Sequence, residues 1–249
     1  LANMALAQYN MGFSAIDTVA TMLPLFHVGG LCIQTLPALY VGARVILHAR
    51  FDASAALACF AQDRPTLTLQ VPATMRALLE HPQWPHTDLS SLRAVWAGSS
   101  VLPAHLVQAF QVRSLAVCNV YGSTETGPFS IALGAAHAQS HFGSCGWPAQ
   151  TKKLQVQVRL EARHDPSVSE TDDGIGELCI RAPNVAQCYW PNLPLVDAQG
   201  YFHTGDLAFC APDGSYTVVG RAKDMLISGG ENIYPAEIEN LLAAHPQIA

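Results

Sequence analysis

Charged residues are scarce in this chain, and several common motifs are missing from it. Only 13% of the 249 residues are charged, and the net charge of −6 argues against a nucleic-acid-binding protein. The sequence has no GxxxxGKS/T phosphate loop, no GxGxxG dinucleotide fingerprint and no GxSxG hydrolase elbow. Its ten histidines show no HExxH or other metal-ligand spacing, which disfavours a zinc site.

Signals for membranes and secretion are also lacking. No apolar run is long enough to span a bilayer, and residues 1–7 lack the basic start of a signal peptide. The seven cysteines are odd in number, scattered and without a CxxC pair, which is typical of reduced thiols in a cytoplasmic protein. The hydrophobic content of 50% predicts a large core or a surface covered by a partner, so a homodimer is left open.

Residues 1–145 contain an alternation of strand and helix patterns. Apolar runs predict strands at 17–25, 43–47, 66–71, 92–97 and 115–120. Helix patterns lie at 1–12, 31–39, 53–62, 72–81 and 103–111, with Asp52 as an N-cap and Pro72 as a first helical residue. The alternation predicts an α/β domain with a mostly parallel sheet and flanking helices, in which residues 43–47 form a buried strand.

The pattern changes after residue 145. Alternating residues at 153–160, 177–181, 207–210 and 215–219 predict a small antiparallel, β-barrel-like subdomain over residues 146–222. A strand pattern at 225–227, a glycine turn and a helix beginning at Pro235 predict the start of a small α+β domain over residues 223–249. The chain begins like a helix already under way and stops within this last domain, so we expect a fragment.

Two short polar stretches flank the last pair of alternating segments. They are residues 204–206 (TGD) and 220–224 (GRAKD), with an Asp213-Gly214 turn between them. Asp206 and Arg221, on opposite ends of one hairpin, can converge on a single polyhydroxy ligand. A carboxylate accepts hydrogen bonds from two vicinal hydroxyls, and a guanidinium donates them in a fixed fork. The pair therefore predicts a ribose-binding site.

A second polar stretch, residues 121–125 (YGSTE), follows the predicted strand 115–120. Ligands of open α/β sheets bind at the carboxyl ends of strands. There Thr124 can approach phosphate oxygens, Glu125 is a hard oxygen ligand that suits Mg²⁺, and Tyr121 offers a flat face to a base. Taken alone, the stretch is equally well explained as an ordinary turn in which the threonine caps a helix and the tyrosine packs in the core.

Two further stretches are weaker indications of the same site. Gly98, Ser99 and Ser100 end the preceding strand and can pass under a planar base, although an ordinary loop with a serine cap explains them as well. His27 precedes the pair Gly29-Gly30 and can line or gate a pocket, although such a histidine is more often a half-buried structural residue.

Together these stretches resemble the AMP-forming acyl-CoA synthetase family of the adenylate-forming enzymes. The matching segments are residues 24–30 (PLFHVGG), 121–126 (YGSTET), 176–178 (GEL), 201–206 (YFHTGD) and 220–239 (GRAKDMLISGGENIYPAEIE). The resemblance implies activation of a carboxylic acid, either fatty or aryl, in two steps. ATP and the acid give an acyl-adenylate and pyrophosphate, and coenzyme A then displaces AMP to give a thioester.

The resemblance also implies roles for individual residues. Tyr121 would stack on adenine, Thr124 would contact phosphate, Glu125 would hold Mg²⁺, and Asp206 with Arg221 would bind the ribose. Lys223 would be the hinge of the C-terminal domain, and His27 would stand at the junction of acyl group and coenzyme A. The remaining implied site residues lie beside the adenylate or along the pantetheine path: Gly98, Ser99, Ser100, Asn119, Gly122, Gly229, Gly230 and Asn232.

Two departures from the family pattern bear on activity. The family's phosphate loop would precede residue 1 and its late catalytic lysine would follow residue 249, so we expect the chain alone to be inactive. A carrier-protein-loading adenylation domain and a non-catalytic nucleotide-binding remnant are the alternatives. The stretch from Asn232 to Glu239 favours a coenzyme A ligase over the first, and the intact Glu125, Asp206, Arg221 and Lys223 favour an enzyme over the second.

Overall fold

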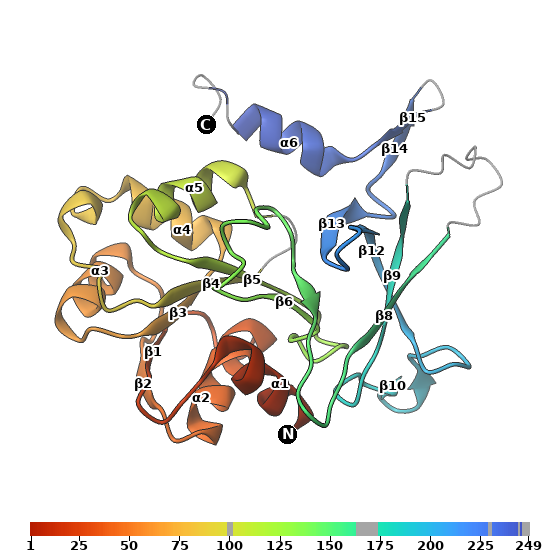
Figure 1. The fold of residues 1–249 in the computed structure, drawn as a ribbon, viewed down its shortest axis with the longest axis horizontal. Coiled ribbons are helices and arrows are strands. Elements are labelled where there is room, and N and C mark those ends of the chain that lie inside the picture. The colour runs from red at the N-terminus through yellow and green to blue at the C-terminus, as the bar shows by residue number, and fades with distance from the viewer. Residues whose placement is uncertain (99–101, 163–173, 229–230, 244, 246–249) are drawn as a thin grey trace.

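The structure is a computed structural model that describes residues 1–98, 102–162, 174–228, 231–243 and 245 (Figure 1). Within these residues no helix combines the length and apolarity needed to cross a bilayer. All seven cysteines are free thiols.

A seven-stranded sheet forms the first part of the molecule, in the order β2-β1-β3-β4-β5-β6-β7. The first five strands are parallel, and the last two are antiparallel to their neighbours. The bounds are β1 Thr18–Thr21, β2 Arg44–Leu47, β3 Leu67–Gln70, β4 Ala94–Gly98, β5 Val117–Tyr121, β6 Ile131–Leu133 and β7 Trp147–Pro148. The predicted α/β fold with a mostly parallel sheet is confirmed.

Helices cover both faces of this sheet (Figure 1). One face carries α1 (Ala2–Met11), η1 (Gly29–Thr35) and α2 (Leu36–Tyr40); the other carries α3 (Ala53–Gln62), α4 (Pro72–Glu80), η2 (Trp84–His86) and α5 (Ala104–Val112). Successive strand residues alternate between the two resulting cores. Ala94 and Trp96 belong to one buried cluster, and Val95 and Ala97 belong to the other.

Local signals explain several element boundaries. Asp52 caps α3, since its Oδ1 accepts a hydrogen bond from the Ala55 amide at 2.8 Å. The prediction that residues 43–47 form a buried strand is wrong with respect to burial. β2 is the edge strand of the sheet, and its residues are exposed or half-buried, because one of its long sides has no neighbouring strand.

A four-stranded antiparallel sheet follows, in the order β13-β12-β9-β8, which confirms the predicted second β-rich part. Its bounds are β8 Gln157–Glu161, β9 Ile175–Arg181, β12 Phe202–Cys210 and β13 Tyr216–Arg221; the short strands β10 (Cys188–Tyr189) and β11 (Leu193–Pro194) form a separate hairpin. β7 still pairs with β6 in the first sheet, although it lies beyond residue 145. The division of the chain at that residue stays a prediction.

Backbone hydrogen bonds hold the two sheets together. The Cys145 amide donates to the Tyr216 carbonyl, and the Tyr216 amide donates to the Gly146 carbonyl, both at 2.8 Å. Since Tyr216 begins β13 and Gly146 directly precedes β7, these bonds attach the start of β13 to the start of β7.

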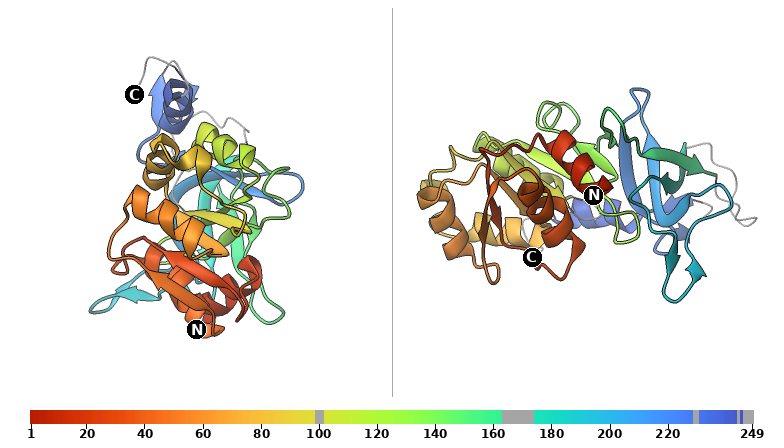
Figure 2. Two further views of the ribbon diagram at one scale, coloured as in Figure 1. Left: turned by 90° about the vertical axis from the view of Figure 1, so that its left-hand side faces the viewer. Right: turned by 90° about the horizontal axis from the view of Figure 1, so that it is seen from below.

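The last elements are β14 (Leu226–Ser228), β15 (Glu231–Ile233) and α6 (Pro235–Ala243). β14 and α6 match the predicted strand and helix, whereas β15 was not predicted. Figures 1 and 2 show α6 beyond α4 and α5, at the end of the molecule farthest from α1.

Candidate functional site

Three predicted site residues from distant parts of the chain meet at one carboxylate. Asp206 on β12 lies opposite Arg221 on β13, and its Oδ1 is 3.0 Å from the Arg221 Nε. The Tyr121 hydroxyl, at the carboxyl end of β5, donates to the Asp206 Oδ2 at 2.7 Å. Asp206 is 8% exposed and Tyr121 is 5% exposed, whereas the Arg221 side chain is 51% exposed. The group is therefore a nearly buried acid with one open, cationic side.

Some features around Asp206 raise the pKa of its carboxyl and others lower it. Burial raises the pKa of its carboxyl, and the hydrogen bond from Tyr121 and the charge of Arg221 counter that rise only in part. Burial and the neighbouring Asp206 raise the pKa of the Tyr121 hydroxyl well above its ordinary value. Tyr121 therefore stays a protonated donor, and Asp206 is the group that accepts hydrogen bonds.

Removing the guanidinium should make this acid weaker. Replacing Arg221 with glutamine is expected to raise the pKa of Asp206 further, because Arg221 is one of the two groups that lower it. When folding raises the pKa of a carboxyl, the folded state holds the proton more tightly than the unfolded chain does. The resulting stabilisation is fully present below the pKa of the unfolded chain and is lost as pH rises through the pKa of the folded state. The variant should therefore lose this contribution at a higher pH than the parent does. NMR titration of the Asp206 carboxyl carbon measures the pKa, with Arg64→Gln as the exposed control. An unchanged or lowered pKa would contradict the assignment.

Hydrogen bonds from neighbouring residues stabilise the bend at Gly205, next to Asp206. Gly205 adopts a φ of 71° and its amide donates to the Glu177 Oε1 at 2.9 Å. The Thr204 hydroxyl donates to the Leu178 carbonyl at 2.7 Å and accepts from the Asp206 amide at 3.1 Å. Glu177 and Thr204 belong to stretches already noted in the sequence, but their partners lie on another strand. We infer that they orient the acid.

The loop after β5 is held by short side chains and a close backbone contact. The Ser123 amide donates to the hydroxyl of Thr126, which is fully buried, at 2.8 Å. Gly122 lies so near the following chain that a Cβ there would be 2.4 Å from the Pro128 carbonyl oxygen. Thr124 remains exposed at the tip. The packing of the loop thus leaves the predicted phosphate-contacting hydroxyl open to solvent.

This packing predicts a specific cost for a methyl group at residue 122. Gly122→Ala is expected to lower the free energy of unfolding by about 1–3 kcal/mol, because overpacking forces the backbone to shift. Chemical denaturation measures the loss. Gly134→Ala is the matched control, since a Cβ there would have its nearest neighbour, the Asn10 carbonyl oxygen, at 3.9 Å. Equal losses in the two variants would contradict the close-contact explanation.

Glu125 has a partner that the sequence did not predict. Its Oε1 accepts a hydrogen bond from the Tyr189 hydroxyl at 2.8 Å, and its backbone carbonyl accepts from the Ala186 amide at 2.8 Å. Burial alone would raise the pKa of Glu125, but the Tyr189 hydrogen bond and the charge of Arg221 help to lower it overall. Glu125 is therefore an ionised carboxylate held in one orientation. No local pattern links residues 64 positions apart in the sequence.

Other predicted site residues lie on β4, on β5 and in the turn that follows β13. Asn119 lies two residues before Tyr121 on β5, is buried, and donates from its amide to the Ser144 carbonyl at 3.2 Å. Gly98 pairs with Val120 at the end of β4. Lys223 is exposed in the turn that follows Arg221. The adjacent Ala222 amide donates to the Gly205 carbonyl at 2.9 Å, so this turn is attached to the bend beside Asp206.

His27 lies in a different segment, before η1. It is exposed, and its Nδ1 accepts a hydrogen bond from the Gly29 amide at 3.0 Å. This contact leaves the Nε2 of the neutral ring as the atom that carries the proton. Ser99, Ser100, Gly229 and Gly230 lie outside the described residues, and Asn232 is described only through its backbone pairing with Ile227.

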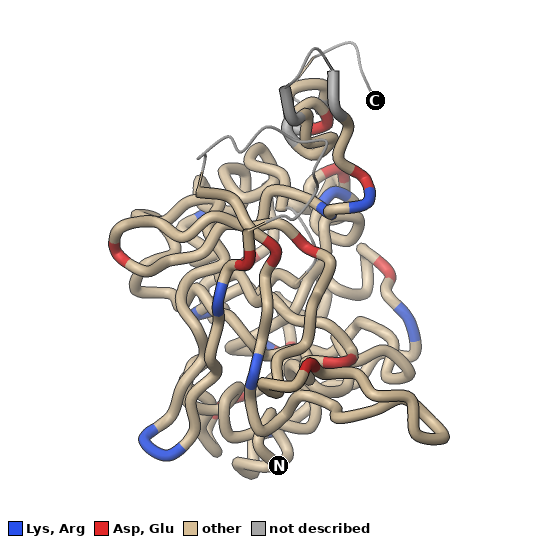
Figure 3. Tube along the Cα trace, turned by 90° about the vertical axis from the view of Figure 1, so that its right-hand side faces the viewer, with Lys and Arg blue, Asp and Glu red and all other residues tan. Residues whose placement is uncertain are grey.

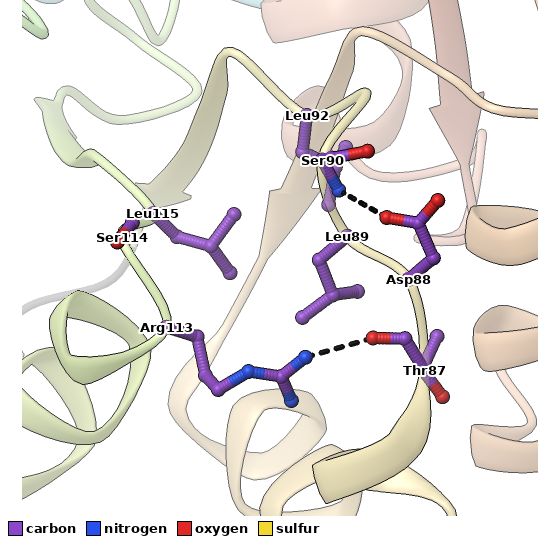
Figure 4. Close-up of a pocket in the computed structure, with 8 residues that line it drawn as sticks. All are labelled: Thr87, Asp88, Leu89, Ser90, Leu92, Arg113, Ser114 and Leu115. Atoms are coloured by element: carbon purple, nitrogen blue, oxygen red, sulfur yellow. Dashed lines mark hydrogen bonds between the residues drawn. The ribbon is translucent and has the colours of Figure 1, made fainter.

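A cavity of about 370 Å³ lies at the opposite ends of β4 and β5, between residues 87–92 and 113–115 (Figure 4). The Arg113 guanidinium there donates to the carbonyls of Trp84 and Thr87 at 2.5 and 2.7 Å. Asp88 is engaged by Arg64 and by the Ser90 amide. Because these groups already serve the local backbone, and because the cavity faces the amino ends of the strands, it is not part of the Asp206 site.

Comparison with known proteins gives the following matches. The family profile described as "AMP-binding enzyme" matches residues 1–190. An indoleacetate–CoA ligase of Aromatoleum aromaticum is 44% identical over 239 residues, covering 95% of this chain and 46% of the relative. A feruloyl-CoA synthase of Amycolatopsis sp is 41% identical over 229 residues, covering 90% of this chain and 45% of the relative. The chain spans about half the length of the curated relatives it matches.

The fold has a close match among solved structures. The O-succinylbenzoate coenzyme A synthetase of Bacillus subtilis, in complex with ATP and magnesium ion, superposes with a TM-score of 0.83 at 30% identity. The match covers 99% of this chain and 50% of that chain. The similarity therefore extends over both sheets described above.

Proposed function

The chain belongs to the family of AMP-binding enzymes, and from this premise we propose that the protein containing it is an AMP-forming ligase that joins a carboxylic acid to coenzyme A. The observation that carries the proposal is the meeting of Tyr121, Asp206 and Arg221 at one carboxylate. Their contacts support the expectation that these side chains share one site. The relatives named as acid–CoA ligases support coenzyme A as the acceptor of the acyl group.

In the proposed nucleotide complex, the Asp206 carboxylate accepts hydrogen bonds from the ribose hydroxyls, and Arg221 donates to the same sugar. The ring of Tyr121 stacks on the adenine, with Asn119 and Gly98 beside the base, and Thr124 donates to a phosphate oxygen. In this role Asp206 exchanges part of its present pairing for hydroxyl donors of the ligand. Its raised pKa is consistent with a carboxylate that such a donor would stabilise.

Glu125 is the proposed magnesium ligand. It is ionised, its side chain is oriented by Tyr189, and carboxylate oxygens are ligands that Mg²⁺ prefers. A magnesium ion bound there would neutralise charge on the phosphate oxygens of ATP during adenylation. The related synthetase crystallised with ATP and magnesium ion supports the same pair of ligands for this protein.

The proposed reaction has two steps. First, a carboxylate oxygen of the acid attacks the α-phosphorus of ATP, and pyrophosphate leaves with the electrons of the broken P–O bond. The coenzyme A thiol then gives its proton to solvent and attacks the acyl carbon as the thiolate, and AMP leaves with the electrons of the broken C–O bond. Thr124, Asp206 and Arg221 contribute by positioning the nucleotide and by donating to or accepting from its fixed atoms.

The residues proposed for the second step remain predictions from the family resemblance. Lys223 is the proposed hinge and His27 the residue proposed at the acyl–thiol junction. Gly229 and Gly230 are proposed to line the pantetheine path, and Asn232 is proposed to lie near the adenylate. For the acid we propose an aryl substrate, because the indoleacetate and feruloyl ligases above share more than 40% of their aligned residues with this chain.

A substrate panel tests the proposal. The whole protein that contains this chain is incubated with ATP, Mg²⁺, coenzyme A and one acid at a time: indoleacetate, ferulate or a medium-chain fatty acid. We expect AMP release with equimolar thioester, fastest for an aromatic acid. AMP release that does not depend on coenzyme A would point to another acceptor, such as a carrier protein. AMP binding without turnover of any acid would point to a non-catalytic nucleotide-binding protein.

A further inference from the structure

Nitrogen, sulfur and oxygen donors meet on the four-stranded sheet, at side chains to which the proposed nucleotide site assigns no role. Glu161 lies on β8, Cys179 on β9 and His203 on β12. His203 is directly paired with Cys179, and Glu161 is paired with Glu177, the residue two before Cys179. One atom from each of Glu161, Cys179 and His203 lies within 4.8 Å of the others. The three strands thus bring three different metal-binding groups to one point.

The distances suit one small cation. The His203 Nδ1 is 3.5 Å from the Cys179 Sγ and 3.6 Å from the Glu161 Oε2. In a tetrahedral zinc site the metal–ligand bonds are about 2.0–2.3 Å long, which separates neighbouring donor atoms by roughly 3.3–3.6 Å. The two distances from His203 therefore match the required spacing, and all three donor atoms lie within 4.8 Å of one another.

Outer partners orient two of these groups. The other ring nitrogen of His203, Nε2, faces the Asp197 Oδ2 at 3.5 Å. A carboxylate on the far nitrogen of a histidine is the usual arrangement behind a metal-binding imidazole, because it fixes the tautomer that leaves the near nitrogen free to bind. Glu161 is held through its Oε1 by the Arg159 guanidinium, so that its Oε2 is the oxygen facing His203.

The donor set selects the class of cation. Thiolate and imidazole together with a carboxylate favour Zn²⁺, whereas Mg²⁺ and Ca²⁺ prefer oxygen ligands alone. A Cys179 thiolate and the Glu161 carboxylate would balance the two positive charges of the ion. A basic residue accompanies these acids, because Arg159 pairs with both Glu161 and Asp197. Figure 3 shows segments of Lys and Arg among segments of Asp and Glu along the chain.

We propose that Glu161, Cys179 and His203 bind one zinc ion, with water as the fourth ligand and Asp197 as the outer partner of His203. The ion would connect β8, β9 and β12 and would be separate from the magnesium proposed at Glu125. The site does not depend on the proposed ligase activity. Its ligands come from three strands, with Cys179 and His203 24 residues apart, so no short motif of the sequence displays it.

Binding should release a proton from the thiol. Zinc binds cysteine as the thiolate, so the thiol proton of Cys179 must leave when the ion binds. The incoming ion replaces that proton, and its affinity therefore increases with pH. Calorimetry in buffers of different ionisation enthalpy should detect about one proton released per ion.

The test uses the purified protein that contains this chain, stripped with a chelator and titrated with ZnCl₂ in the presence of excess Mg²⁺. We expect one zinc per chain, and with Co²⁺ as the probe we expect a thiolate-to-cobalt charge-transfer band. Cys179→Ser should abolish the band. Asp197→Asn removes the carboxylate that faces the His203 Nε2 and also pairs with Arg159, and it should weaken zinc binding about 10- to 100-fold. Cys188→Ser, an exposed cysteine on β10, is the control and should change neither measurement.

His203→Gln keeps the test decisive if Cys179→Ser fails to fold. The His203 side chain is 40% exposed, so its replacement should leave the fold intact, and thermal denaturation without zinc checks this. Zinc should raise the denaturation midpoint of the parent and not that of His203→Gln. Failure of the parent to bind zinc, a cobalt band that survives Cys179→Ser, or equal zinc stabilisation of His203→Gln would each overturn the proposal.

Discussion

Replacing Asp206 with asparagine is expected to weaken AMP binding about 10- to 100-fold, because a hydrogen bond to a charged group contributes roughly 1.5–3 kcal/mol. Asparagine keeps the shape of the side chain but replaces one acceptor oxygen with a donor. Both carboxylate oxygens of Asp206 are engaged in the free protein, one by Tyr121 and one by Arg221. In the AMP complex both carboxylate oxygens of Asp206 should accept hydrogen bonds. Isothermal titration with AMP measures the change.

The same variant should fold normally, which separates binding from stability. The pKa of Asp206 is raised by burial, so its ionised form is disfavoured in the free protein, and a neutral side chain relieves that cost. We expect the free energy of unfolding at neutral pH to change by no more than about 1 kcal/mol. Asp88→Asn is the matched control, because that exposed carboxylate pairs with Arg64 far along the chain from the site. AMP binding equally weak in both variants would count against the assignment.

Replacing Glu125 with glutamine is expected to lower the rate of acyl-adenylate formation about 100- to 1000-fold, the usual loss when a main source of charge stabilisation is removed. Glutamine keeps the length of the side chain and can still accept a hydrogen bond from Tyr189. It loses the negative charge that a magnesium ligand needs. Pyrophosphate release by the whole protein, measured against Mg²⁺ concentration, reports the loss.

Two companion variants make this result specific. Tyr189→Phe removes the hydroxyl that orients the Glu125 Oε1 and should weaken the apparent affinity for Mg²⁺ about 10- to 100-fold, with a smaller effect on the rate at saturating Mg²⁺. Glu80→Gln, at the exposed end of α4, should leave both quantities unchanged. A normal rate and a normal Mg²⁺ dependence in Glu125→Gln would refute its role as the magnesium ligand.

Much of the fold follows from local sequence patterns. Buried parallel strands read as short apolar runs, and caps such as Asp52 and first-turn prolines such as Pro72 mark helix starts, so the order of elements was predictable. The burial of β2 was not predictable in this way. Its β-branched residues resemble those of a central strand, and only the strand order reveals that it lies at an edge.

The same distinction between local patterns and long-range contacts applies to the residues of the candidate site. Tyr121 and Arg221 end strands, Glu125 lies in the loop after β5, and Asp206 lies within β12 next to the bend at Gly205. Their chemistry showed in short stretches of sequence. Glu177, Tyr189 and the Glu161–Cys179–His203 group depend on contacts between strands that are distant in sequence. Period-2 alternation says which face of a strand a residue occupies, but the neighbour on that face is set by register and by the bulge between Leu207 and Ala208.

Comparing AMP with 2′,3′-dideoxy-AMP, each bound to the parent and to Asp206→Asn, tests the ribose assignment most directly. If Asp206 accepts from the sugar hydroxyls, the parent should bind AMP about 10- to 100-fold more tightly than the dideoxy nucleotide. Asp206→Asn should bind the two with nearly equal affinity. A parent that does not distinguish the nucleotides, or a variant that distinguishes them as well as the parent does, would contradict the assignment of Asp206 to the ribose.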